Sequence, residues 1–244
     1  MPVAKSSGLA LELILLAAGS SSRLGRAKQS VKVNDQALIA RQADVLLTLS
    51  EYCDANEINA QVSCVLGYKA HAIAQLLPVN QRQNIKLINN TNWQSGMGSS
   101  VAMAAAKVRS EPADKALLVL LVDQWQVSNA CMKLLVDAWR LQPNKITVAD
   151  YTAINDIAEE QQADGTEQTN NQQGKKQFGP PIIFPANYTK ALSALSGEQG
   201  AKKIVSENIE HCQFVSLPQA AVDLDTPADL ARLNQQNVLI EKAN

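Results

Sequence analysis

The chain has 244 residues, with 22 Lys and Arg against 23 Asp and Glu and a formal net charge of −1. With 46% hydrophobic residues it can bury one large core, and its length predicts a single domain over residues 1–244. The balanced charge, without runs of Lys and Arg, argues against binding to nucleic acid or to an anionic membrane surface. A phosphate-bearing partner would therefore have to meet a localised site.

The four cysteines are widely spaced and lie in apolar stretches: Cys53, Cys64, Cys131 and Cys212. Without a Cys-x-x-Cys pair, they indicate reduced thiols in the core of a cytoplasmic protein. Residues 9–18 are the segment most similar to a targeting signal, but Glu12 interrupts them and a Gly/Ser/Arg loop follows, so we interpret them as the first strand. No apolar run approaches the roughly 20 residues that span a bilayer, so we expect a soluble protein with no membrane partner.

Apolar runs of strand length alternate along the chain with segments of helical period. The predicted strands are 11–17, 61–66, 85–88, 116–122, 146–149, 181–184 and 213–216. The predicted helices are 37–49, 70–77, 99–108, 127–141, 187–195 and 201–206. This alternation predicts an α/β fold, a three-layer α/β/α sandwich with a mainly parallel sheet. Functional loops are then expected at the carboxyl ends of the strands.

Residues 155–177 break this alternation, because they hold nine Gln and Asn and almost nothing apolar. Such a segment cannot bury enough surface to offset its ordering entropy. We expect a mobile polar insertion that is either a tolerated surface loop or a lid over the site.

The loop after the first strand is made of small residues: Ala17, Ala18, Gly19, Ser20 and Ser21. Such a loop lets a ligand approach the main chain and can point several backbone N–H groups at an anion. Arg23 and Lys28 add positive charge beside it, so a triphosphate is one natural ligand. The spacing fits neither a Walker A loop nor a dinucleotide-binding Gly-x-Gly-x-x-Gly motif. The alternative is a flexible Gly/Ser loop with two surface cations.

Two acidic residues are candidates for binding a metal ion. Asp123 ends the apolar strand at 116–122, where its carboxylate could hold a cation on the phosphates or cap the following turn. Near the C-terminus, Thr226 as N-cap, Pro227 and Asp229 explain a helix start. Asp223 and Asp225 remain, on one side of an extended segment, and Asp225 lies just before the N-cap. Two carboxylates from separate segments suit one Mg²⁺ that also binds phosphate oxygens.

Seven short motifs, taken in order, resemble the nucleotidyltransferases of molybdenum cofactor maturation, and most closely their molybdenum cofactor cytidylyltransferase branch. The resemblance covers about residues 11–235 apart from the polar insertion. The motifs are residues 16–28, 65–68, 90–100, 122–124, 179–182, 197–201 and 223–227. The Ala17-Ala18-Gly19 form of the first motif is similar to that of CTP users.

The resemblance implies a Rossmann-like, glycosyltransferase-A-like nucleotidyltransferase fold. It also implies Mg²⁺-dependent transfer of CMP from CTP to the terminal phosphate of molybdopterin, with release of pyrophosphate. A molybdoenzyme that receives the cofactor would be a further partner. Arg23, Lys28, Asp123 and Asp225 would be catalytic, and Asp123 and Asp225 would bind the metal. The implied nucleotide-binding residues are Ala17, Ala18, Gly19, Ser20, Ser21, Arg23, Lys28, Gly67, Ser100 and Asp123. The implied acceptor-binding residues are Asn90, Gly96, Ser100, Gly179 and Pro181.

The sequence departs from the family pattern mostly on the acceptor side: Trp125, Pro180, Glu198 and Lys202 replace the usual residues. Three alternatives therefore stay open: a GTP-using enzyme, a sugar- or polyol-phosphate nucleotidyltransferase, and a delivery module that binds nucleotide or pterin without chemistry. Trp93 and Trp125 fall among the motifs and are candidates for stacking on a base or pterin.

Overall fold

The computed structural model describes residues 8–111, 114–152, 177–198 and 200–232. Its centre is a seven-stranded sheet in the order β5-β4-β1-β6-β8-β7-β9. The strands are β1 (Ala10–Ala17), β4 (Asn59–Leu66), β5 (Lys86–Asn89), β6 (Ala116–Leu121), β7 (Ile146–Asp150), β8 (Phe178–Phe184) and β9 (Cys212–Ser216). All pairs are parallel except those of β8, which runs antiparallel to both β6 and β7. The predicted α/β fold with a mainly parallel sheet is confirmed.

The middle strands are buried on both faces, which explains their continuous apolar runs. In β1, Leu11, Leu13 and Leu15 belong to one hydrophobic cluster, whereas Ile14 and Leu16 belong to the other. Because neighbouring side chains of a strand point to opposite faces, β1 fills both cores. The two layers of helices therefore pack on a common central strand.

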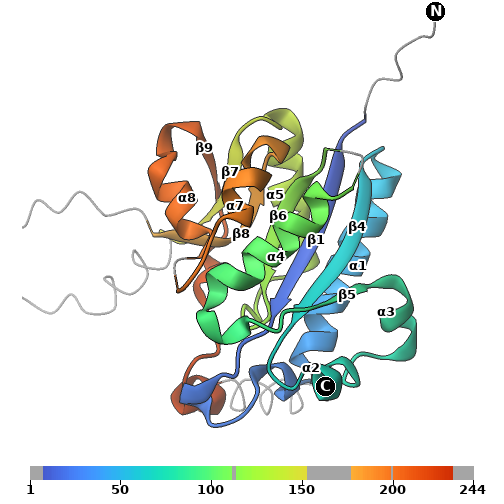
Figure 1. The fold of residues 1–244 in the computed structure, drawn as a ribbon, viewed down its shortest axis with the longest axis vertical. Coiled ribbons are helices and arrows are strands. Elements are labelled where there is room, and N and C mark those ends of the chain that lie inside the picture. The colour runs from blue at the N-terminus through green and yellow to red at the C-terminus, as the bar shows by residue number, and fades with distance from the viewer. Residues whose placement is uncertain (1–7, 112–113, 153–176, 199, 233–244) are drawn as a thin grey trace, which may run out of the picture.

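Helices cover both faces of the sheet, as the ribbon in Figure 1 shows. The cluster on one face takes side chains from α1 (Leu38–Ala55) and α5 (Asn129–Leu141), and the cluster on the other takes them from α4 (Met97–Arg109), α7 (Thr189–Ser193) and α8 (Lys202–Glu207). The short helices α2 (Ala70–Ala74) and α3 (Val79–Asn84) join β4 to β5. None of the described helices combines the length and apolarity needed to cross a membrane.

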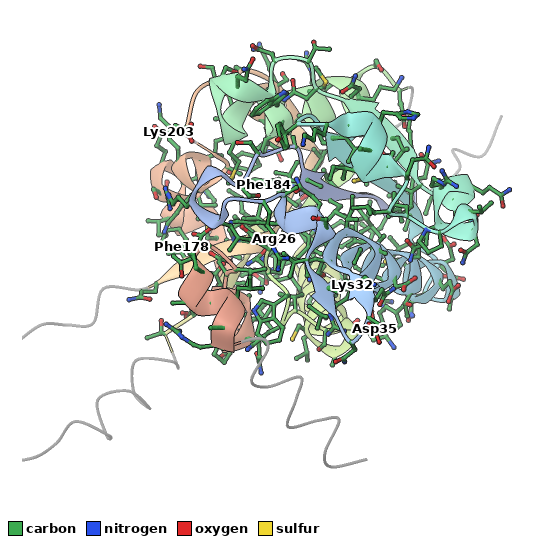
Figure 2. All side chains as sticks on the ribbon, turned by 90° about the horizontal axis from the view of Figure 1, so that it is seen from below. Arg26, Lys32, Asp35, Phe178, Phe184 and Lys203 are labelled. Atoms are coloured by element: carbon green, nitrogen blue, oxygen red, sulfur yellow. The ribbon has the colours of Figure 1, made fainter. Side chains whose placement is uncertain are left out.

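Several elements differ from the sequence-based expectation. A two-stranded hairpin, β2 (Lys32–Val33) with β3 (Gln36–Ala37), is too short to show an alternating pattern. Its turn residues Asn34 and Asp35 both have positive φ, which suits the turns that close tight hairpins. Lys32 and Asp35 of this hairpin, labelled in Figure 2, are both exposed. The helix predicted at 70–77 ends as α2 at Ala74, and α3 was not predicted.

The connection between β7 and β8 starts and returns at one edge of the sheet, because these strands are antiparallel neighbours. The N–H of Tyr151 donates to the carbonyl of Gln177 at 2.8 Å. The polar insertion predicted at 155–177 lies between these two residues and, apart from Gln177, falls outside the described residues.

A group of charges lies at the amino ends of the strands, with Glu12 and Lys115 buried and Lys86 and Glu111 nearer the surface. We call it the basal ion cluster: Glu12, Lys86, Glu111 and Lys115. The Lys115 ammonium lies 3.2 Å from Glu12 and 2.6 Å from Glu111, and the Glu12 carboxylate also accepts a hydrogen bond from Ser63. Hydrogen bonds from Lys115 and Lys86 lower the pKa of Glu111 to about 2. Charge pairing therefore explains why Glu12 can sit in the middle of an apolar strand.

Candidate active site

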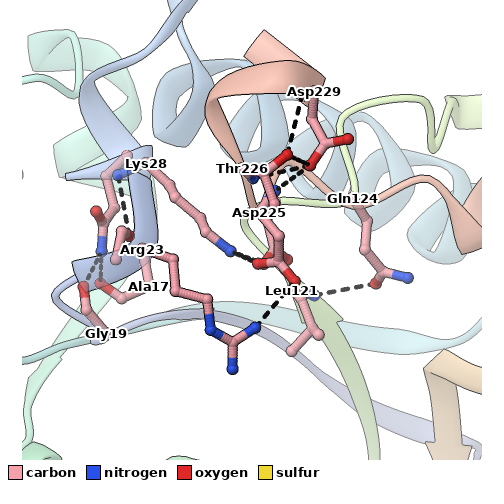
Figure 3. A network of polar contacts seen from close by, with 12 residues as sticks. Ala17, Gly19, Arg23, Lys28, Leu121, Gln124, Asp225, Thr226 and Asp229 are labelled. Carbon is pink, nitrogen blue, oxygen red and sulfur yellow. Dashed lines mark hydrogen bonds and ion pairs between the residues drawn. The ribbon is translucent and has the colours of Figure 1, made fainter. Parts of the chain in front are cut away.

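Parallel pairing brings the predicted site residues to one edge of the sheet. Strands β1 and β6 are parallel neighbours, so the loop after Ala17 and the residue Asp123 both follow carboxyl ends. The N–H of Leu224 donates to the carbonyl of Asp123 at 3.2 Å, which brings Asp225 to the same edge. Figure 3 shows Lys28 reaching from the turn after the loop towards Asp225.

Four of the five carbonyl groups in the loop at residues 17–21 accept hydrogen bonds, whereas the N–H groups of residues 18–21 donate to no described group. Gln29 Nε2 donates to the carbonyls of Ala17 and Gly19 at 2.7 and 2.9 Å. The N–H of Tyr68 donates to the Ala18 carbonyl at 2.9 Å, and the N–H of Leu24 donates to the Ser21 carbonyl at 3.1 Å. In the described part of the chain, no group accepts a hydrogen bond from the N–H groups of residues 18–21. Successive N–H groups without partners are typical of a site for an anion such as phosphate.

Lys28 is shared by the two predicted metal ligands. Its ammonium lies 2.8 Å from Asp123 Oδ2 and also donates to Asp225 Oδ1. The side chains are 12%, 17% and 43% exposed for Lys28, Asp123 and Asp225, so the cluster is open to ligands mainly from the Asp225 side. Burial lowers the pKa of Lys28, but the charges and hydrogen bonds of the two carboxylates outweigh burial and raise it. Lys28 is therefore firmly protonated.

The carboxylates of Asp123 and Asp225 offer an unpartnered oxygen to a divalent cation, but they cannot complete its coordination shell by themselves. Asp123 Oδ1 is buried and has no hydrogen-bond partner, so one oxygen is left over for a ligand. Among the described residues no group of three or more His, Cys, Asp and Glu could hold a metal by itself. A cation here would have to complete its shell with phosphate oxygens and water, as Mg²⁺ commonly does.

Asp223 adds a third acidic group near the pair. Partial desolvation and the negative charges of Asp123 and Asp225 raise the pKa of Asp223 to about 7, although the residue keeps an exposed surface. The nearby Lys28 acts in the opposite direction. The carboxyl groups therefore repel one another enough that positive charge at this position is favourable.

Local structure fixes the position of Asp225. The N–H of Asp229 donates to Thr226 Oγ1 at 3.2 Å, and the N–H of Thr226 donates to Asp229 Oδ2 at 2.8 Å. This reciprocal pair is a capping box, and the residues that follow, 227–232, are helical as predicted. Arg23 reaches the same carboxylate from the other side, with Nη1 3.9 Å from Asp225 Oδ2 and a side chain that is 81% exposed.

A pocket of about 340 Å³ lies against this cluster. The predicted site residues that line it are Ala17, Ala18, Gly19, Ser20, Ser21, Lys28, Gly96, Ser100 and Asp123. The predicted site residues outside its lining are Arg23, Gly67, Asn90, Gly179, Pro181 and Asp225. The pocket is also lined by Gln29, Gln94, Met97 and Glu198, to which the sequence analysis assigned no binding role. Trp93 also lines the pocket, whereas Trp125 packs against the core cluster beneath α1 and α5.

Gly67 and Asn90 contact residues that line the pocket. A Cβ atom on Gly67 would lie 2.5 Å from Trp93 Cβ and 2.8 Å from the carbonyl oxygen of Ala18. The buried side-chain amide of Asn90 donates to the hydroxyls of Ser99 and Ser100 at 2.9 and 3.0 Å. Both residues therefore hold the pocket wall by packing or hydrogen bonding, and their predicted ligand contacts stay predictions.

A second close approach, between the backbone at Gly96 and the backbone at Gly197, lies on the side of the pocket formed by α4 and the turn with Glu198. Gly96 has a φ of 105°, and a Cβ atom there would overlap the backbone of Gly197. The N–H of Gly98 donates to the Gly197 carbonyl at 2.9 Å. The start of α4 and the turn that carries Glu198 are thereby fixed to each other.

Gly179 and Pro181 lie in β8, where the chain packs tightly around Tyr151. A Cβ atom on Gly179 would lie 2.7 Å from Tyr151 Oη, and Pro181 is buried. Gln124 Nε2 donates to the carbonyls of Pro180 and Ala220 at 2.5 and 2.7 Å. Gln124, which sequence reasoning treated only as part of a motif, ties the end of β6 to β8 and to the segment that leads to Asp225.

Residues 13–212 match the family described as MobA-like NTP transferase domain. A search of curated proteins found no match. Among solved structures, the chain is similar to Rv0371c of Mycobacterium tuberculosis in complex with manganese, with 21% identity, a TM-score of 0.61 and coverage of 93% of this chain and 98% of that one.

Two further solved structures share the fold. A nucleotidyl transferase of Methanothermobacter thermautotrophicus, Mth528, has 15% identity and a TM-score of 0.65, with coverage of 94% and 98% of the two chains. The 4-diphosphocytidyl-2C-methyl-D-erythritol synthase of Anaerococcus prevotii has 12% identity and a TM-score of 0.62, with the same coverage. At these identities the likeness shows the fold alone.

Proposed function

Because the chain belongs to the family of MobA-like NTP transferase domains, we propose that it transfers CMP from CTP to the terminal phosphate of molybdopterin, with Mg²⁺ as its cofactor. The observation that carries this proposal is the loop at residues 17–21. Its N–H groups are free beside a protonated lysine and a carboxylate pair at the edge of one pocket. That arrangement suits a triphosphate with a divalent cation.

In the proposed reaction, the N–H groups of residues 18–21 bind the phosphate chain and hold it still. An oxygen of the acceptor phosphate attacks the α-phosphorus, and the bond from that phosphorus to the β-phosphate oxygen breaks as pyrophosphate leaves. Lys28 and Arg23 neutralise the charge that develops on pyrophosphate, and Arg23 is exposed enough to swing onto it. Positioning and electrostatic stabilisation supply most of the rate enhancement in such transfers.

Asp123 and Asp225 would hold Mg²⁺, which would supply further positive charge to the reacting phosphates. Asp123 Oδ1 is the buried oxygen that has no partner within the protein. Rv0371c, which has a similar fold, was solved as a complex with manganese, which supports a divalent cation as the cofactor.

The choice of CTP rests on the Ala17-Ala18-Gly19 motif. The diphosphocytidyl group in the name of the Anaerococcus prevotii neighbour is consistent with it. The choice of molybdopterin rests on the sequence resemblance. The same neighbour carries an erythritol in its name, which keeps a polyol phosphate as the second candidate acceptor.

The direct test measures pyrophosphate release with each of the four NTPs and Mg²⁺. Each NTP is offered without an acceptor, with molybdopterin, with its molybdenum form and with a panel of sugar and polyol phosphates. We expect release with CTP and molybdopterin or its molybdenum form. Release only with a sugar or polyol phosphate would replace the acceptor, and release with GTP alone would replace the nucleotide. Nucleotide binding without pyrophosphate under any condition would make the chain a delivery module.

A further inference from the structure

Gln29 is buried against the loop at residues 17–21, directly after the last residue of the first motif, Lys28. Its side chain is 1% exposed. Its Nε2 donates to the carbonyl of Ala17 at 2.7 Å and to that of Gly19 at 2.9 Å. Both hydrogens of one side-chain amide are thus used on one loop, as the dashed lines beside Ala17 and Gly19 show in Figure 3.

These two hydrogen bonds decide where two N–H groups of the loop point. In a planar trans peptide the C=O and N–H bonds point in opposite directions. Fixing the carbonyl of Ala17 on Gln29 therefore turns the N–H of Ala18 away from Gln29. Fixing the carbonyl of Gly19 does the same for the N–H of Ser20. Neither of these N–H groups has a partner in the described part of the chain.

Gln29 also shares a short turn with the lysine of the site. The turn Lys28–Ser30 presents Lys28 to the two carboxylates and Gln29 to the loop carbonyls. The N–H of Lys28 itself donates to Ser21 Oγ at 3.1 Å. One turn therefore fixes the loop N–H groups and the ammonium relative to each other.

We propose that Gln29 is a positioning residue for phosphate recognition, which points the N–H groups of Ala18 and Ser20 at the phosphate chain without touching it. This inference rests on the proposed function, because it takes the free N–H groups as the triphosphate site. We therefore expect the contribution of the β- and γ-phosphates to nucleotide binding to depend on Gln29.

The test compares Gln29→Met with Gln81→Met. Gln81 is a matched control because it is also 1% exposed and its Nε2 also donates twice, to Ala40 O at 2.9 Å and to Asp44 Oδ1 at 2.5 Å. The Oε1 atoms of Gln29 and Gln81 are both buried without a hydrogen-bond partner among the described residues. It lies on α3 and does not line the pocket. Thermal unfolding of both variants shows how much stability each substitution removes.

Binding of inorganic tripolyphosphate, CTP and CMP with Mg²⁺ is measured by calorimetry. We expect Gln29→Met to lose about 10-fold or more in affinity for CTP and tripolyphosphate, the amount that two hydrogen bonds typically contribute. Affinity for CMP should change less than about 3-fold, and Gln81→Met should bind all three ligands as the wild type does. Gln29→Glu keeps the shape but presents a second acceptor to the carbonyls, so it should show the same selective loss and replaces Gln29→Met if that variant does not fold.

Two results would overturn the proposal. One is a folded Gln29 variant with wild-type affinity for tripolyphosphate, and the other is an equal loss for CMP and CTP. If the wild type itself binds neither CTP nor tripolyphosphate, the proposed function fails, which is a separate outcome.

Discussion

Replacing Lys28 with a residue that lacks an ammonium should strengthen metal binding, and the same replacement should abolish turnover. Lys28 already occupies the space between Asp123 and Asp225, where the proposed cation would bind. A divalent ion about 4 Å from an ammonium would be repelled by about 8 kcal/mol at an effective dielectric constant of 20, so the two cannot share the carboxylates. The metal must therefore displace Lys28 before it can bind, unless phosphates draw Lys28 away.

The cost of that displacement sets the size of the effect. The three side chains are 12%, 17% and 43% exposed, so the pair is neither fully buried nor fully solvated. We therefore assign the contacts of Lys28 with the two carboxylates a net free energy of about 1–2 kcal/mol, which lies between the values typical of exposed and of buried ion pairs. We therefore expect Lys28→Met to bind Mn²⁺ about 5–30-fold more tightly than the wild type when no nucleotide is present.

Electron paramagnetic resonance of Mn²⁺ titrations measures this affinity directly, with and without CTP. Lys32→Met, which removes an exposed lysine of the β2–β3 hairpin, is the control and should leave Mn²⁺ affinity unchanged. Equal or weaker Mn²⁺ binding by Lys28→Met would show that the carboxylate pair is not the metal site or that Lys28 does not compete for it.

Further predictions test the carboxylates, the pocket wall and the basal ion cluster. Asp123→Asn and Asp225→Asn should each lower turnover on the order of 100-fold or more at saturating Mg²⁺; near-normal rates would refute the metal assignment. Gly67→Ala should weaken CTP binding and lower stability by about 1–3 kcal/mol, since its Cβ would overlap Trp93 and the Ala18 carbonyl; calorimetry and urea unfolding check both. The lowered pKa of Glu111 predicts a stability contribution that is complete above about pH 4.3 and is lost as the pH falls towards 2. Urea midpoints between pH 5 and 2 should therefore fall less steeply in Glu111→Gln than in the wild type, and parallel curves would contradict the pairing.

Patterns local in the sequence predicted most of the fold. The apolar runs of β1 and β6 predicted central strands because residues buried on both faces leave no alternation. Strand direction has no such signature, so nothing in the run of residues 181–184 indicated that β8 is antiparallel to its neighbours. Its first three residues, Phe178, Gly179 and Pro180, were missed, because consecutive prolines such as Pro180 and Pro181 are typical of turns.

The residues of the candidate site also divide into those that the sequence predicted and those that it did not. Residues that follow strand ends could be placed together from the sequence, and the structure brings Lys28, Asp123 and Asp225 into contact. The roles of Gln29 and Gln124 could not be predicted, because their partners are backbone carbonyls, which have no sequence signature. For Gln29, its position next to a motif lysine was the one available hint.

The antiparallel pairing of β7 with β8 leaves the gap between Tyr151 and Gln177 bridged by one backbone hydrogen bond. Because the entropic cost of closing a loop grows only with the logarithm of its length, the number of residues between these two ends adds little to the cost of pairing the strands. Strand register is thus insulated from changes in the number of residues inserted there. That junction offers a natural grafting point, at which a tag, a fluorophore-bearing peptide or a short turn can replace residues 153–176 while the neighbouring strands keep their pairing.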